Sequence, residues 1–147
     1  MEGRVLAVDP GSVRIGVAIS DPMRVVASPL TVVKHVSLEK DLHAISLLCE
    51  QHEVTMVIIG QALGPDGETT PASRHAQKIA EGLLKIVSVP VVLWDESGST
   101  QKAINTKVEM GVARKKRSGH LDAYAAAIIL QSFIDTRRNG EVYVPEE

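Results

Sequence analysis

Short apolar runs, each bounded by turn-forming residues, recur along this chain, and such runs predict buried strands. The first run ends at Asp9-Pro10-Gly11, and the connection to the second is so short that the two strands must be antiparallel. The third run contains Pro29, which a strand tolerates only at the edge of a sheet or where the strand is irregular. The five predicted strands cover residues 4–8, 15–19, 25–33, 54–59 and 89–94.

Segments with helical spacing of apolar residues follow the third strand. Ser37 is a favourable N-cap for the first helix, whose apolar positions run from Leu38 to Cys49. Thr70 before Pro71 is a typical helix start, and an apolar stripe follows it as far as residue 87. The last helix is expected over residues 120–137. Residues 99–110 are weakly helical, and residues 111–119 are expected to form a basic loop.

The order of these elements predicts the fold class. Three strands come first, and helices then alternate with the two remaining strands. This order indicates an α/β domain with a mixed five-stranded sheet, antiparallel in its first three strands and parallel thereafter, flanked by helices. The length of 147 residues suits a single domain. We expect that domain over residues 1–138, with residues 139–147 as a C-terminal tail.

The composition narrows the possible function classes. No apolar stretch approaches the ~20 residues of a membrane span, and the amino terminus lacks a secretory pattern. The lone cysteine, Cys49, lies among the apolar residues of a predicted helix. We therefore expect a buried, structural thiol and a cytoplasmic protein. The net charge of −2 does not by itself indicate nucleic-acid binding.

Basic residues are nevertheless concentrated between residues 101 and 117. Six of them stand there against a single acid, Glu109. Such a run is often only a solvated surface. Because this one directly precedes Asp122, it is also a candidate clamp for a phosphate backbone. The run comprises Lys102, Lys107, Arg114, Lys115, Lys116 and Arg117.

Three acids stand where a strand ends or a helix begins. Asp9 and Glu96 follow buried strands, and Asp122 shares the apolar face of the last helix. Each has an ordinary explanation: a turn former, a loop acid, and a first-turn charge that favours the helix dipole. A carboxylate loses hydration on burial, however, so three such acids on different elements favour one metal-binding, phosphate-cleaving site. Asp95 is the reserve for Glu96, because neighbouring strand residues face opposite ways.

Motifs in a specific order cover nearly the whole chain. They are Val8-Asp9-Pro10-Gly11, residues 14–21, Val57-Ile58-Ile59-Gly60, Asp95-Glu96, Lys115-Lys116-Arg117 and residues 122–126. Together they resemble the YqgF family, which is associated with Holliday junction resolution and pre-16S rRNA cleavage. The resemblance implies an RNase H-like fold and a metal-dependent phosphodiesterase site that uses Mg²⁺ or Mn²⁺. The implied catalytic and metal-binding acids are Asp9, Glu96 and Asp122, and the implied substrate-binding residues are Arg14, Lys115, Lys116 and Arg117.

Three functions remain open at this point. The first is a metal-dependent endonuclease, acting by the family resemblance on precursor 16S rRNA or on branched DNA junctions. The second is nucleic-acid binding without cleavage in ribosome assembly or transcription, which Ser97 would favour because the family usually has Arg there. The third is nucleotide phosphate transfer, since residues 9–12 also resemble the phosphate loop of sugar kinases and actin. Those enzymes clamp nucleotide between two domains. We expect a monomer or a weak homodimer.

Overall fold

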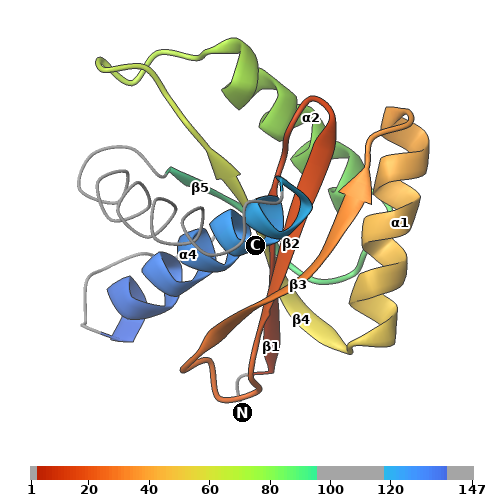
Figure 1. Cartoon of the computed structure of the whole chain (residues 1–147), viewed down its shortest axis with the longest axis vertical. Coiled ribbons are helices and arrows are strands. Elements are labelled where there is room, and N and C mark those ends of the chain that lie inside the picture. The colour runs from red at the N-terminus through yellow and green to blue at the C-terminus, as the bar shows by residue number, and fades with distance from the viewer. Residues whose placement is uncertain (1–2, 96–117, 139–147) are drawn as a thin grey trace.

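One mixed sheet forms the centre of the molecule in a computed structural model that describes residues 3–95 and 118–138 (Figure 1). The strands are β1 (Arg4–Asp9), β2 (Arg14–Ser20), β3 (Ala27–Lys34), β4 (Val54–Gln61) and β5 (Val91–Asp95). Their order across the sheet is β3-β2-β1-β4-β5. The pairs β1–β2 and β2–β3 are antiparallel, whereas β1–β4 and β4–β5 are parallel. The fold class predicted from the sequence is confirmed.

Helices cover both faces of this sheet. Helices α1 (Leu38–Gln51) and α2 (Pro71–Leu84) pack on one face, and α4 (Ser118–Arg138) packs on the other (Figure 1). Side chains of β1 alternate between two cores: Val5 and Ala7 join the core under α4, while Leu6 and Val8 join the core under α1 and α2. A strand buried on both faces is a nearly continuous apolar run, which is why β1 is so evident in the sequence. No helix in the described part of the chain is long and apolar enough to span a membrane.

The starts of α1 and α2 lie where the sequence predicts them. The Ser37 hydroxyl accepts a hydrogen bond from the Lys40 backbone N–H at 3.2 Å. Thr70 and Ser73 form a reciprocal capping box, and Pro71 opens the helix. These local signals satisfy N–H groups that have no partner inside the helix.

The start of α4 differs from the prediction. The helix begins at Ser118 rather than at residue 120, so the first-turn position expected for Asp122 is wrong: Asp122 lies in the second turn. Gly119 does not interrupt the helix, because docking of the apolar face outweighs the modest helix penalty of one glycine. The remaining residues of the expected basic loop, 111–117, and the weak helix over 99–110 lie outside the described residues.

The third strand begins two residues later than predicted. Asp21 accepts hydrogen bonds from the backbone N–H groups of Met23, Val25 and Val26, and this holds the segment before Ala27 as a turn. Pro29 lies in β3 at the edge of the sheet, where its missing N–H costs no ladder bond. The edge position expected for this proline is therefore confirmed.

The backbone of α4 touches the sheet at Gly16 of β2. A Cβ atom on Gly16 would lie 2.0 Å from the carbonyl oxygen of Asp122 and 2.5 Å from its carbonyl carbon. No side chain fits in that space, so glycine is what allows α4 to approach β2 so closely. Gly16 pairs with Asp9 of β1, and the contact therefore brings Asp122 beside the end of β1.

Replacing Gly16 with alanine should force α4 away from the sheet. We expect Gly16→Ala to lower the free energy of unfolding by about 3 kcal/mol, because the added methyl group meets backbone and not a flexible side chain. Gly67→Ala is the matched control: nothing lies within 4 Å of its Cβ position, and only its φ of +80° is unfavourable. That control should cost about 1 kcal/mol. Urea unfolding of both variants measures the difference, and equal costs would contradict the close contact.

Candidate active site

Asp9 ends β1 on the face of the sheet that α4 covers. It continues the alternation of Val5 and Ala7, both of which pack under α4. Asp9 pairs with Gly16, the residue on which the α4 backbone rests. The side chain is half-buried, so the carboxylate stands where the core under α4 opens to solvent.

Asp122 reaches the same place from α4. Its carboxylate accepts a hydrogen bond from Arg14 Nε at 2.7 Å, and Arg14 is the first residue of β2. The two side chains are 39% and 33% exposed, so this ion pair lies at the surface of the site. A guanidinium carries five N–H donors, and the bond to Asp122 uses one of them. Arg14 can therefore hold Asp122 and still donate to a phosphate.

Burial and the neighbouring negative charge of Asp122 raise the pKa of Asp9 to about 6. An ordinary aspartate is fully ionised at that pH. Burial, which disfavours the charged form, is the larger cause of this shift, and the nearby Asp122 carboxylate is the smaller one. Two such carboxylates are stabilised by a cation between them, and their oxygen ligands suit Mg²⁺ or Mn²⁺.

The third predicted acid, Glu96, lies outside the described residues, as do Lys115, Lys116 and Arg117. In the described part of the chain, no group of three or more His, Cys, Asp or Glu residues is placed to hold a metal ion. The structure thus brings together Asp9, Asp122 and Arg14 of the predicted site. The assignment of Glu96 and of the three basic residues to that site stays a prediction.

Two further acids, Asp95 and Asp21, do not share the position of Asp9. Trp94 of β5 packs with the core under α4, so its neighbour Asp95 alternates toward the opposite face. Asp21 lies after β2, at the opposite end of the sheet from Asp9. Its pKa is lowered, first by the hydrogen bond from the Val26 backbone, which is the role of a turn former.

Cys49 is buried in α1, as the sequence predicts. Burial raises the pKa of its thiol to about 11. A thiol with such a pKa holds its proton at neutral pH and is a poor nucleophile. Cys49 therefore has a structural role.

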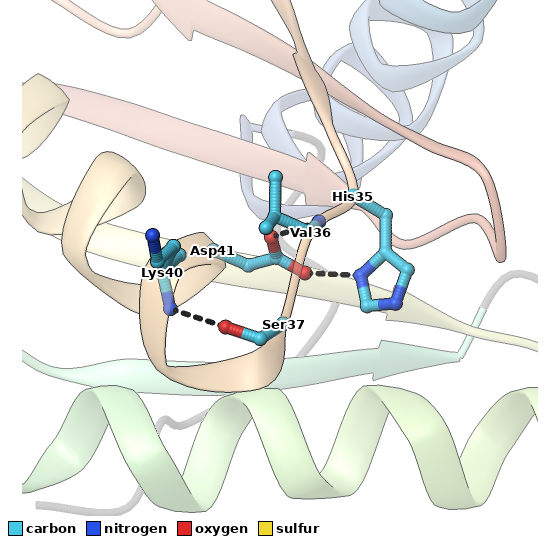
Figure 2. Close-up of polar contacts among 5 residues, drawn as sticks. All are labelled: His35, Val36, Ser37, Lys40 and Asp41. Carbon is cyan, nitrogen blue, oxygen red and sulfur yellow. Dashed lines mark hydrogen bonds and ion pairs between the residues drawn. The ribbon is translucent and has the colours of Figure 1, made fainter.

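One polar group near the site was not predicted from the sequence. His35 pairs with the buried carboxylate of Asp41 (Figure 2). The ring of His75 of α2 lies edge to face with that of His35. Nothing in the sequence signals this cluster, because its members come from three segments and show no metal-ligand spacing. The cluster lies on the α1 and α2 side of the turn between Asp9 and Arg14.

The sheet order, the helices and the acid at the end of the first strand define an RNase H-like domain. Solved structures share this fold. RuvC from T. thermophilus in complex with Holliday junction substrate is similar over 94% of this chain and 97% of its own, with a TM-score of 0.60 and 18% identity. The fowlpox virus Holliday junction resolvase is similar over 90% of this chain and 99% of its own, with a TM-score of 0.55 and 15% identity.

Sequence similarity then assigns the chain to a family. The model of the RuvX family, described as Holliday junction resolvase, matches residues 3–136, and the chain belongs to this family. A protein of Myxococcus xanthus named "Putative pre-16S rRNA nuclease" is 37% identical over 98% of this chain and 96% of its own length. A protein of the same name from Anaeromyxobacter sp. is 39% identical over 91% of this chain and 98% of its own.

The raised pKa of Asp9 predicts a pH-dependent gain in stability for Asp9→Asn in metal-free buffer. The folded state favours the protonated acid, so the native protein loses stability as the pH rises from about 4 to 6. Asparagine imitates the neutral acid. We expect the variant to be more stable at pH 8 by up to about 3 kcal/mol, since each pKa unit corresponds to about 1.4 kcal/mol.

Urea unfolding with EDTA at pH 3.5 and pH 8 measures this gain. The gain should be nearly absent at the lower pH, where Asp9 is mostly protonated in both the folded and the unfolded protein. The exposed Asp66 offers a control, and Asp66→Asn should show no comparable gain. If Asp9→Asn leaves the stability at pH 8 unchanged, ionising Asp9 costs the folded protein no free energy and the prediction is wrong.

Proposed function

We propose that this protein is a metal-dependent endonuclease that hydrolyses phosphodiester bonds, with precursor 16S rRNA as its substrate. The observation that carries the proposal is the placement of two carboxylates, Asp9 and Asp122, at one end of a central strand, with Arg14 bonded to Asp122. Burial beside a second carboxylate disfavours the charged form of Asp9 in the free protein. Binding of a hard cation supplies a reason for this placement, and the names of the family relatives agree with that reason.

The third ligand in this proposal is Glu96. Val92 and Trp94 pack with the core under α4, and continuing the alternation of β5 by one residue predicts Glu96 on that same face. Asp95 would then face the opposite side of the sheet and is not a ligand in this proposal. In the proposed site, Asp9, Glu96 and Asp122 hold Mg²⁺ or Mn²⁺.

Each residue has a defined part in the proposed reaction. A bound divalent cation would lower the pKa of the attacking water and stabilise the leaving oxygen. Arg14 fixes the Asp122 carboxylate and presents its remaining N–H groups to the scissile phosphate. Lys115, Lys116 and Arg117 would hold the neighbouring backbone by charge. The protein would act in the cytoplasm as a monomer or a weak homodimer.

A second candidate substrate is the Holliday junction, because the matching family model is described by that activity. Nucleic-acid binding without cleavage, the second function considered from the sequence, would leave the placement of Asp9 beside Asp122 unexplained. One experiment distinguishes rRNA cleavage, junction cleavage and binding without cleavage. The purified protein is incubated with a precursor 16S rRNA fragment or a four-way DNA junction, each with Mn²⁺ or EDTA. We expect metal-dependent cleavage of the RNA. Binding of either nucleic acid without cleavage in any metal would overturn the nuclease proposal.

Substitution of Asp9 or Asp122 tests whether these acids are needed for cleavage but not for nucleic-acid binding. Asp9→Asn and Asp122→Asn should each reduce metal-dependent cleavage by about 100-fold or more, because a lost direct ligand costs more than a lost second-layer partner. Binding of nucleic acid in EDTA should be retained. Asp66→Asn is the matched control and should cleave at the parent rate. Cleavage by Asp9→Asn at that rate would place the site elsewhere.

The basic residues Lys115 and Lys116 should contribute to the affinity for nucleic acid but not to the cleavage step itself. The double variant Lys115→Ala, Lys116→Ala should bind RNA more weakly and flatten the plot of log affinity against log salt by about 0.7 per lost phosphate contact. Lys85→Ala with Arg138→Ala is the control, since both residues are exposed at helix ends remote from Asp9. If the slope of the Lys115 and Lys116 variant stays at the parent value, these lysines are only a solvated surface.

A further inference from the structure

A cavity of about 460 cubic ångströms borders the turn between β1 and β2, on the side of the sheet that α2 covers. The space is many times that of one water molecule, so it admits a group as large as a sugar ring. Three segments meet around it: the turn itself, the first residue after β3, and α2. The lining residues are Pro10, Ser12, His35, Pro71, Ala72 and His75.

The cavity lies next to the candidate active site. Pro10 directly follows Asp9, and His35 directly follows β3. The His35 backbone N–H donates to the carbonyl oxygen of Val13, the neighbour of Arg14, at 2.9 Å. Asp9 ends β1, and β3 is the second strand from β1 across the sheet, so two strand spacings, roughly 10 Å, separate the two positions. That span is on the scale of a nucleotide, so a nucleic-acid strand at Asp9 can place a neighbouring sugar in the cavity.

A buried carboxylate fixes the hydrogen of the His35 ring. The Asp41 side chain of α1 is 2% exposed, lies 2.5 Å from His35 Nδ1, and accepts the Val36 backbone N–H at 3.0 Å (Figure 2). A neutral imidazole carries hydrogen on one nitrogen only, and an ionised carboxylate can only accept. The contact with Asp41 therefore places the hydrogen on Nδ1. The other ring nitrogen, Nε2, is then a hydrogen-bond acceptor.

This acceptor is open to a ligand. The His35 side chain lines the cavity and is 37% exposed, while its Nδ1 edge faces the buried Asp41. Nε2 lies on the ring edge away from Asp41 in Figure 2. Within the described residues, the hydrogen bond of Nδ1 is the one that the His35 ring makes. The free nitrogen of the ring therefore selects a ligand that can donate a hydrogen bond.

An acceptor beside a nuclease site distinguishes RNA from DNA. The sugar–phosphate backbone of DNA offers acceptors only, whereas each ribose of RNA has a 2′-hydroxyl that both donates and accepts. Amino groups of bases are the other donors, but bases are usually bound by stacking on free aromatic faces. In this cavity the rings of His35 and His75 already contact each other edge to face, with centroids 6.5 Å apart, and the other lining residues are small. The Ser12 hydroxyl in the same lining can donate to the oxygen of a bound hydroxyl.

We propose that this cavity binds a ribose of the RNA substrate beside the scissile phosphate, with the 2′-hydroxyl donating to Nε2 of His35. Asp41 is a positioning residue, because it holds the ring hydrogen on Nδ1 and leaves Nε2 as the acceptor. The inference rests on the proposed nuclease function and deepens it, since it favours RNA over a DNA junction as the substrate. A deoxyribose in the same place would displace water from Nε2 and leave that nitrogen without a donor.

The first test observes the ring and is independent of cleavage. Nitrogen NMR of the His35 ring at pH 8, where free histidine is neutral, distinguishes the two tautomers. We expect hydrogen on Nδ1. In EDTA, a saturating single-stranded RNA should shift the Nε2 resonance, and DNA of the same sequence should not. His43, exposed on α1, is the control ring. Hydrogen on Nε2, no shift with RNA, or an equal shift with DNA would each overturn the inference.

The second test removes one 2′-hydroxyl at a time from a precursor 16S rRNA fragment. Binding is measured in EDTA, so that cleavage does not intervene. For the parent protein, a single 2′-deoxy nucleotide beside the scissile phosphate should weaken binding about fivefold, as expected for the loss of one hydrogen bond. A matched series replaces base amino groups instead, for example adenosine by purine riboside. If binding weakens only in that series, the cavity reads a base and the inference is wrong.

Substitution of His35 then links the sensitive nucleotide to the cavity. Asparagine places its amide nitrogen near the position of ring Nδ1, so His35→Asn keeps a donor to Asp41 and removes Nε2. This variant should bind the 2′-deoxy fragment and the unmodified fragment equally well. His43→Asn is the matched control and should keep the sensitivity of the parent. Thermal unfolding checks that each variant is folded before it is compared.

The outcomes separate this inference from the nuclease proposal. Additive losses from His35→Asn and the 2′-deoxy nucleotide would contradict the contact between them. Cleavage of the RNA with Mn²⁺, but with no 2′-deoxy-sensitive nucleotide, would reject the ribose site alone. Absence of cleavage in any metal, with the 2′-deoxy effect and its loss in His35→Asn intact, would support the ribose site and reject the nuclease function.

Discussion

At Gly16 the backbone of α4 meets the backbone of β2 with no side chain between them. This contact fixes the position of Asp122 along the sheet, because a helix that close cannot slide without collision. It also selects the partner of Asp122, since Gly16 pairs with Asp9 in the β1–β2 ladder. The location of the acidic pair therefore depends on the absence of one methyl group.

Alternation along the strands then divides the polar groups between the two faces. Asp9 lies on the α4 face, while Pro10 and Ser12 border the cavity on the α2 side. A single turn thus borders two different surfaces. On one surface, burial and the neighbouring Asp122 carboxylate raise the pKa of Asp9. On the other, the rings of His35 and His75 lie edge to face beside the start of α2.

The sequence predicted the parts of this arrangement that depend on local patterns. Apolar runs located the strands, and Ser37 and Thr70 located two helix starts, because strand burial and capping act over a few residues. Asp9 and Asp122 were predicted as site residues from their positions at element ends, and the structure places both beside Gly16. The start of α4 was misplaced, because docking on the sheet and not Gly119 decides where that helix begins. The His35, Asp41 and His75 cluster was missed because only the packing of α1 and α2 brings it together.

The ion pair between Arg14 and Asp122 joins residues 108 positions apart in the chain. During synthesis, the first strand and its turn therefore leave the ribosome long before the helix that completes the acidic pair. A nascent chain that lacks α4 carries Asp9 and Arg14 without Asp122, and the apolar face of its sheet has no cover. The acidic pair and the apolar core under α4 therefore both require α4, the last described helix to be made. The acidic pair of this chain therefore cannot form until the segment that carries α4 has been made.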